Sequence, residues 1–224
     1  MKRLRIKIFF FLLFMSSFLI FSQNLESSKD FQTWNNLELK HKVLKNLDFA
    51  FKGGVRLMDN SRNVSKYFTD LSIKMKHNNL ISYSLGYRCL FNKNNDSLFD
   101  KYKRFYGDFC FKKKIYNRFS INLRTRFQSQ IDPIFGFKEN VKNKLREKIK
   151  FNYHFKEMDL DVFTSLEFFY FFDNGFEKIR YIIGAQKSLI DKLDLGCNFM
   201  YQDELNDPFK SVFAFRTTIS YRIL

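Results

Sequence analysis

The sequence predicts an all-β fold, a transmembrane antiparallel up-and-down β-barrel. Three observations lead to it: period-two alternation, long strands and unequal connections. The alternation is clearest in residues 145–172, where Leu145, Ile149 and Phe151 are interleaved with basic side chains before a four-residue turn. Successive side chains of a strand point to opposite faces, so this stretch is a hairpin with one apolar and one charged face. A chain with 19% aromatic and 28% charged residues fits such interleaving along most of its length.

Strand length is the second observation. Strands that cross a bilayer at a tilt need about 9–11 residues, whereas soluble strands usually have about 5–6. Eleven segments of about ten residues or more carry the alternation: 34–43, 47–57, 67–77, 81–91, 102–113, 119–130, 145–155, 160–172, 179–188, 193–202 and 211–224.

The connections are the third observation, because short turns alternate with longer polar loops. The short turns are 44–46, 78–79, 114–118, 156–159 and 189–192, and the longer loops are 59–66, 92–100, 131–143 and 203–210. In outer-membrane barrels the short turns are periplasmic. Bacterial single-chain barrels have even strand numbers, so we expect twelve strands, with a partial strand in 24–33. Ten strands, with one segment outside the barrel, is the alternative.

The N-terminus has the pattern of a secretory signal peptide. A basic start is followed by an apolar run of about fourteen residues and then Ser22. The apolar run is short for the alternative, a membrane anchor. We therefore predict a signal peptide at 1–22, a flexible leader at 23–30, a barrel at 31–224 and location in the bacterial outer membrane. Removing the signal lowers the net charge from +16 to +12, because Lys2, Arg3, Arg5 and Lys7 are lost.

The charged face of the predicted sheet would line the lumen of the barrel, and it is strongly basic. On this register it carries Glu38, Lys40, Lys42, Asp48, Lys52, Arg56, Asp70, Lys74, Lys76, Arg88, Arg104, Asp108, Arg124, Arg126, Arg146, Lys148, Lys150, Glu167, Lys178, Arg180, Arg216 and Arg222. The clearest exception on the apolar face is Glu147, which we expect near the outer rim because it follows a long loop.

A basic ladder within this face is the candidate binding site. Its residues are Arg124, Arg126, Arg146, Lys148, Lys150 and Arg180. Facing rows of cations repel unless Asp108, Glu167, Asp161 or a solute anion lies between them. Two interpretations follow: a salt-bridged network that fills a narrow lumen, or a pore that favours anions.

No catalytic, metal or cofactor site is predicted. His41, His77 and His154 all lie beside short turns, away from the outer leaflet where a lipid hydrolase would act; on this register His41 and His77 face lipid and His154 faces the lumen. Hydrolase, zinc-protease and phosphate-loop motifs are absent from the sequence. The three cysteines lack metal-type spacing.

The strands LRTRFQSQ, LREKIKFNYHF, SLEFFYFF, KIRYIIGAQKSL and LDLGCNFMYQ, with an early Trp34, resemble an uncharacterised domain-of-unknown-function (DUF) family of small outer-membrane β-barrels. The resemblance implies the fold and the location and carries no activity.

We therefore expect an outer-membrane barrel, structural or a narrow porin-like pore for small anionic solutes. The alternatives are a lipid-modifying barrel enzyme and a secreted soluble β-protein that binds polyanions. Expected partners are outer-membrane lipids including lipopolysaccharide, and the barrel-assembly machinery through the C-terminal strand. Nucleic acid is not an expected partner, because export separates the chain from it.

Overall fold

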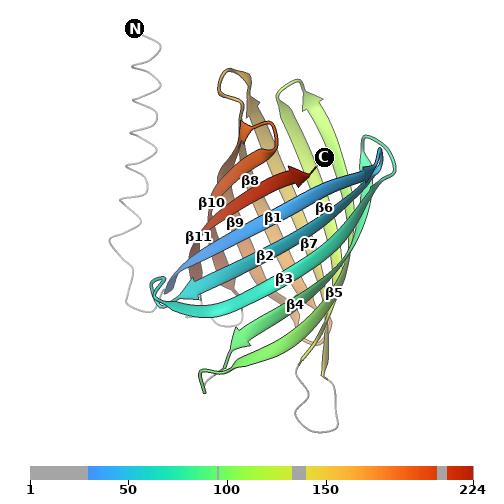
Figure 1. Ribbon diagram of the computed structural model, residues 1–224. Coiled ribbons are helices and arrows are strands. Elements are labelled where there is room, and N and C mark those ends of the chain that lie inside the picture. Colours follow the sequence, from blue (N-terminus) through green and yellow to red (C-terminus); the bar gives the residue numbers. More distant parts are fainter. Residues whose placement is uncertain (1–29, 95, 133–139, 206–210, 224) are drawn as a thin grey trace.

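The computed structural model describes residues 30–94, 96–132, 140–205 and 211–223. The predicted signal peptide and residues 23–29 of the predicted leader lie outside this range. The described residues form eleven strands (Figure 1): β1 Asp30–Leu44, β2 Leu47–Met58, β3 Asn63–Lys76, β4 Ile81–Lys93, β5 Phe99–Tyr116, β6 Phe119–Ile131, β7 Val141–Phe155, β8 Leu160–Phe171, β9 Gly175–Ile190, β10 Leu193–Glu204 and β11 Val212–Ile223. Each predicted segment corresponds to one of them.

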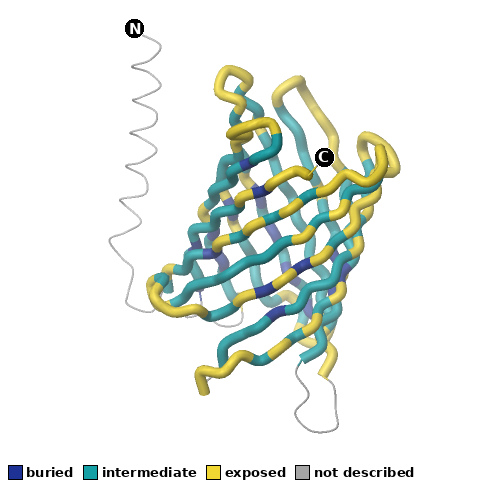
Figure 2. Tube along the Cα trace, in the orientation of Figure 1, coloured by how far each residue is buried: buried dark blue, intermediate teal, exposed yellow. Residues whose placement is uncertain are grey.

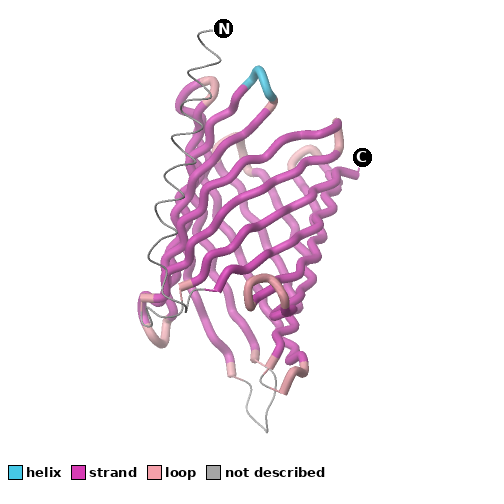
Figure 3. The backbone as a smooth tube through the Cα atoms, turned by 90° about the vertical axis from the view of Figure 1, so that its left-hand side faces the viewer, coloured by secondary structure: helices cyan, strands magenta, loops and turns pink. Residues whose placement is uncertain are grey.

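The strands close into one barrel in sequence order (Figure 3). Neighbours in the sequence pair antiparallel throughout, and β1 pairs with β11 in parallel, from Asp30 opposite Val212 to His41 opposite Ile223. The prediction of twelve strands and its alternative of ten are therefore wrong for the described chain. The even-number rule assumes that the first and last strands close antiparallel, and a parallel seam removes that requirement.

The two ends of the barrel differ. We call the end that carries the β1–β2 turn the short-turn end, and the opposite end, which carries connections 132–140 and 205–211, the long-loop end. Both β1 and β11 run from the long-loop end to the short-turn end. No helix among the described residues has the length and hydropathy to cross a membrane.

The strands are strongly staggered around the barrel. One row of paired residues runs across ten strands through Lys42, Asp48, Lys74, Ser84, Asp108, Arg126, Arg146, Phe169, Lys178 and Glu204. It begins near the short-turn end of β1 and finishes at the long-loop end of β10. Closed barrels need this shear, together with a strand tilt of about 35–45°.

Burial is the reverse of that in a soluble sheet (Figure 2). The large apolar side chains of the outer face are exposed, for example Leu85 at 72% and Leu37 at 64%. The buried apolar side chains point into the barrel, where Ile182, Met200 and Ala214 form a small cluster with Trp34. An apolar outside over a polar inside is the arrangement of a barrel surrounded by lipid.

Glu147 does not lie near the rim, so that prediction is wrong. It is the seventh of the fifteen residues of β7, paired with Thr125 on one side and Phe168 on the other. Its Oε2 accepts a hydrogen bond of 2.9 Å from the Thr125 hydroxyl. The long loop ends at residue 140, and β7 begins four residues before the predicted segment, which moves Glu147 into the middle of the strand.

Candidate functional site in the barrel lumen

A cavity of about 1200 Å³ occupies the lumen and is lined mostly by charged and polar side chains. With one exception, every charged residue that the alternation assigned to the lumen lines this cavity. The exception is Lys150, whose Nζ lies 3.9 Å from the centre of the Phe163 ring. Period-two alternation therefore places charges correctly in this fold.

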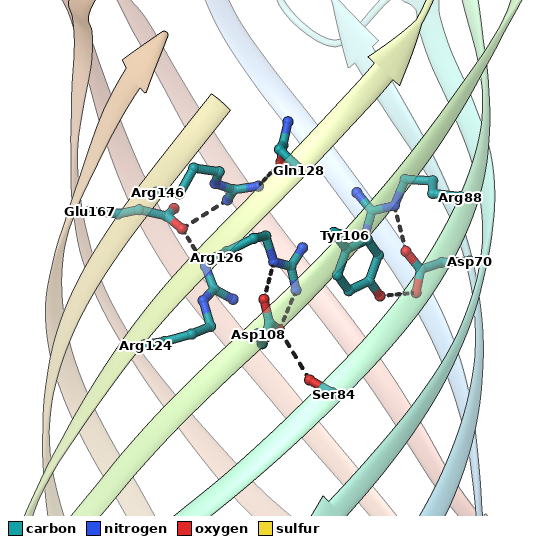
Figure 4. A network of polar contacts seen from close by, with 10 residues as sticks. All are labelled: Asp70, Ser84, Arg88, Tyr106, Asp108, Arg124, Arg126, Gln128, Arg146 and Glu167. Carbon is teal, nitrogen blue, oxygen red and sulfur yellow. Dashed lines mark hydrogen bonds and ion pairs between the residues drawn. The ribbon is translucent and has the colours of Figure 1, made fainter. Parts of the chain in front are cut away.

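Glu167, only 2% exposed, is the main counter-charge of the predicted ladder (Figure 4). One of its oxygens accepts hydrogen bonds from Arg124 and from Arg146, the latter at 2.8 Å. Its other oxygen lies 3.7 Å from Arg180. Three arginines from three strands thus converge on one buried carboxylate, and this arrangement corresponds to the salt-bridged interpretation of the ladder.

Two further carboxylates neutralise arginines nearby. Asp108 accepts two hydrogen bonds from Arg126, at 2.5 and 2.7 Å, and a third of 3.3 Å from Ser84. Forked contacts of this kind fix the guanidinium in one orientation.

Asp70, on β3, binds side chains from β4 and β5. It accepts a hydrogen bond of 2.6 Å from Arg88 and one of 2.8 Å from the Tyr106 hydroxyl, as Figure 4 shows. Gly86 makes room for the tyrosine, because a Cβ there would lie 2.1 Å from Tyr106 Cζ. The glycine on β4 is therefore required by packing inside the lumen.

Aromatic rings cover the faces of the lumen arginines. Arg126 lies 3.8 Å from the Tyr106 ring centre, and Arg56 lies 3.8 Å from that of Trp34. Arg180 lies 4.5 Å from the ring of Phe169. Cation–π contacts of this kind stabilise guanidinium groups that have been removed from water.

Positive charge nevertheless exceeds negative charge in the lining of the larger cavity. Among the described residues that line it, five are carboxylates, Glu38, Asp48, Asp70, Asp108 and Glu167, and eighteen are lysines or arginines. Several of these cations are direct cross-strand neighbours, such as Arg56 with Lys66 and Arg88 with Arg104. Like charges placed opposite each other destabilise a sheet.

Eight of the cations have no carboxylate within 4.0 Å among the described residues: Lys42, Arg56, Lys66, Lys74, Arg104, Lys144, Lys148 and Arg216. Arg104 donates a hydrogen bond of 2.5 Å to the amide oxygen of Gln130. Lys144 lies 3.6 Å from the ring centre of Phe171.

A second cavity, of about 350 Å³, includes residues near the long-loop end of the strands, among them Asn92 and Lys93. It shares five lining residues with the larger cavity: Trp34, Arg56, Lys66, Lys178 and Arg180. These five residues mark the boundary between the cavities, and we call them the constriction. A solute that moved from one cavity to the other would pass four cations and one aromatic ring.

The sequence missed Lys66 and Lys144. It assigned Lys66 to the loop 59–66 and left Lys144 between the loop 131–143 and the segment 145–155, whereas β3 begins at Asn63 and β7 at Val141. Continuing the alternation backward from Arg146 by one step would have placed Lys144 on the lumen face, and the same step from Phe68 would have placed Lys66 there.

Metal ligands and histidines are the remaining candidate groups in the described part of the chain. No group of three or more His, Cys, Asp or Glu side chains there could hold a metal ion. His154 Nδ1 lies 2.9 Å from Asp161 Oδ1 at the short-turn end. His41 pairs across strands with Phe49 and Ile223, whose side chains are exposed, and all three are among the residues that line the larger cavity.

Comparisons with known proteins give a family model and distantly similar solved structures. The family model described as Protein of unknown function (DUF2490) matches residues 31–212. No curated protein matches the sequence. Among solved structures, the beta domain of the Bordetella autotransporter Brka aligns with a TM-score of 0.49 and 8% identity, over 78% of this chain and 82% of that chain.

Proposed function

The chain belongs to the DUF2490 family, and from that premise we propose that it is an outer-membrane barrel whose basic lumen binds and passes small anionic solutes. The observation that carries the proposal is the surplus of cations over carboxylates around the two lumen cavities. Fixed positive charge along a narrow, water-filled path concentrates anions and repels cations. The proposed role is binding and passage, without a catalytic step.

The outer face supports a place in the outer membrane. Exposed leucines and phenylalanines surround the barrel, and the described strands pair in a closed sheet, as a bilayer requires. Lipid, including lipopolysaccharide, is the proposed surrounding, and β11 is the proposed contact for the assembly machinery. The short-turn end would face the periplasm.

Conductance in planar bilayers tests the proposal. Purified barrel is inserted under a salt gradient, and the reversal potential gives the ratio of anion to cation permeability. We expect small, anion-selective channels, since four cations mark the boundary between the cavities. Lys66→Gln should lower the selectivity, and Lys101→Gln, which removes an exposed charge outside the lumen, should leave it unchanged. Silent bilayers or cation selectivity would refute a pore.

A sealed structural barrel is the second candidate, and the network around Glu167 favours it. Three arginines, one carboxylate and the ring of Phe169 pack together in the lumen. Silent bilayers, combined with a band that shifts on boiling in gel electrophoresis, would select this candidate over the pore.

A further inference from the structure

We propose that the constriction is a binding site for a phosphate group, held by Arg56 and Lys66 of the constriction together with Arg104 of the larger cavity. The inference rests on the proposed function, because the ligand reaches the site only through the lumen. It adds a chemical class of ligand and a position to the general preference for anions.

The three cations meet at one place although they come from three strands. Arg56 on β2 is the direct cross-strand partner of Lys66 on β3. Lys66 is the cross-strand partner of Asn92 on β4, and Arg104 on β5 is that of Arg88 on the same strand. Arg56 and Lys66 line both cavities, and Arg104 lines the larger one. The positive charge is therefore concentrated where the two cavities meet.

Hydrogen-bonding groups at this place lack partners within the described chain. The Nε atoms of Arg56 and Arg104 are buried and donate to nothing. A buried donor without an acceptor is costly, and the cost is larger for a charged group. An oxyanion at the constriction would accept from both guanidinium groups and would separate the repelling charges.

Asn92 distinguishes phosphate from other oxyanions. It is the cross-strand partner of Lys66, and it lines the smaller cavity. Its Oδ1 is buried and accepts no hydrogen bond. At neutral pH inorganic phosphate presents bare oxygens to the cations and still carries a hydroxyl that can donate to this amide oxygen. Sulfate has no such donor, so the site should prefer phosphate to sulfate.

The chain contains a built-in reporter for this site. Trp34 is its single tryptophan, and its ring lies 3.8 Å from the guanidinium of Arg56. An anion that draws Arg56 away from the ring changes the surroundings of the indole. In the folded barrel, tryptophan fluorescence therefore reports changes around Trp34, which is one of the five residues of the constriction.

The experiment titrates the folded full-length mature barrel in detergent micelles with sodium phosphate, sodium sulfate or sodium chloride at constant ionic strength. We expect a saturable fluorescence change with phosphate, a weaker one with sulfate and none with chloride. A parallel titration with glycerol 3-phosphate compares a free with an esterified phosphate. Saturation by either supports the site, and saturation by neither overturns it.

Three variants locate the site. Lys66→Gln should weaken phosphate binding about tenfold, as expected for one lost charged hydrogen bond. Asn92→Ala should keep binding but reduce the preference for phosphate over sulfate by about fivefold. Lys74→Gln removes a lumen charge that lines only the larger cavity, and its affinity should stay within about twofold of the parent. An equal loss in Lys66→Gln and Lys74→Gln would show diffuse attraction and overturn the site.

The two proposals fail separately. Anion-selective conductance without saturable phosphate binding would overturn the site and leave the proposed function standing. Saturable phosphate binding in a barrel that conducts nothing would overturn passage and leave the site standing. A melting curve of each variant confirms that it is folded before titration.

Discussion

Replacing Glu167 with glutamine should strongly destabilise the barrel. The carboxylate is 2% exposed and is the shared partner of Arg124, Arg146 and Arg180. Glutamine has the same shape and still offers one amide oxygen, so packing is preserved. The substitution removes only the negative charge, and three partly buried guanidinium groups are then left without their counter-ion.

The size of the expected destabilisation follows from the burial of Glu167. Breaking a buried ion pair by neutralising one partner costs about 3–5 kcal/mol, because an uncompensated charge remains inside. The amide oxygen retains one hydrogen bond, so we expect the lower part of that range, about 3 kcal/mol. With a denaturant dependence of about 3 kcal/mol/M at most, the urea midpoint should fall by on the order of 1 M.

Urea unfolding of the barrel in micelles measures this loss, followed by tryptophan fluorescence and by gel migration with and without boiling. The matched control is Asp48→Asn. Asp48 pairs with Lys76 at 2.7 Å, but their side chains are 28% and 44% exposed. Exposed pairs contribute about 0.2–1 kcal/mol, so the control should move the midpoint by a few tenths of a molar at most. Equal shifts in the two variants would refute the view that Glu167 is the central counter-charge of the lumen.

Three further predictions use the same unfolding assay. Lys66→Gln should raise stability by up to about 1 kcal/mol at low salt, because it removes repulsion from Arg56, and the gain should shrink at high salt. A loss of stability instead would contradict the view that Lys66 lacks a counter-charge and is repelled by Arg56. Gly86→Ala should cost about 1–3 kcal/mol by displacing Tyr106, and an unchanged midpoint would mean that the ring moves freely. Glu147→Gln should stabilise the barrel in lipid vesicles by about 1 kcal/mol, since the residue faces outward in mid-strand; no gain would indicate that a carboxylate is tolerated there.

Much of the fold could be predicted from the sequence, because in a barrel the side-chain period alone decides which face a residue occupies. Arg124 and Arg126 lie two positions apart and both enter the lumen, as alternation requires. The ends of the strands were harder to predict. Polar residues such as Lys66 and Lys144 look like loop residues, although a lumen tolerates them inside a strand.

Contacts across the lumen could not be predicted from the sequence. Glu167 meets Arg124 from a strand two positions away, and that meeting depends on the stagger between strands. Stagger is fixed by the closure of the whole barrel and leaves no local pattern. The parallel seam is similar, because nothing within β1 or β11 alone specifies the direction of its partner.

That seam has a consequence for how the barrel forms. Antiparallel neighbours along the chain are joined by short connections and can form one hairpin at a time, with little loop-closure entropy lost at each step. The seam instead joins Asp30 to Val212, across nearly the whole described chain. Contacts between residues so far apart in the sequence form slowly, and parallel strand pairing is slightly less stable than antiparallel pairing. Closure is therefore the last event of folding, and until it occurs β1 and β11 are the two open edges of an eleven-stranded sheet.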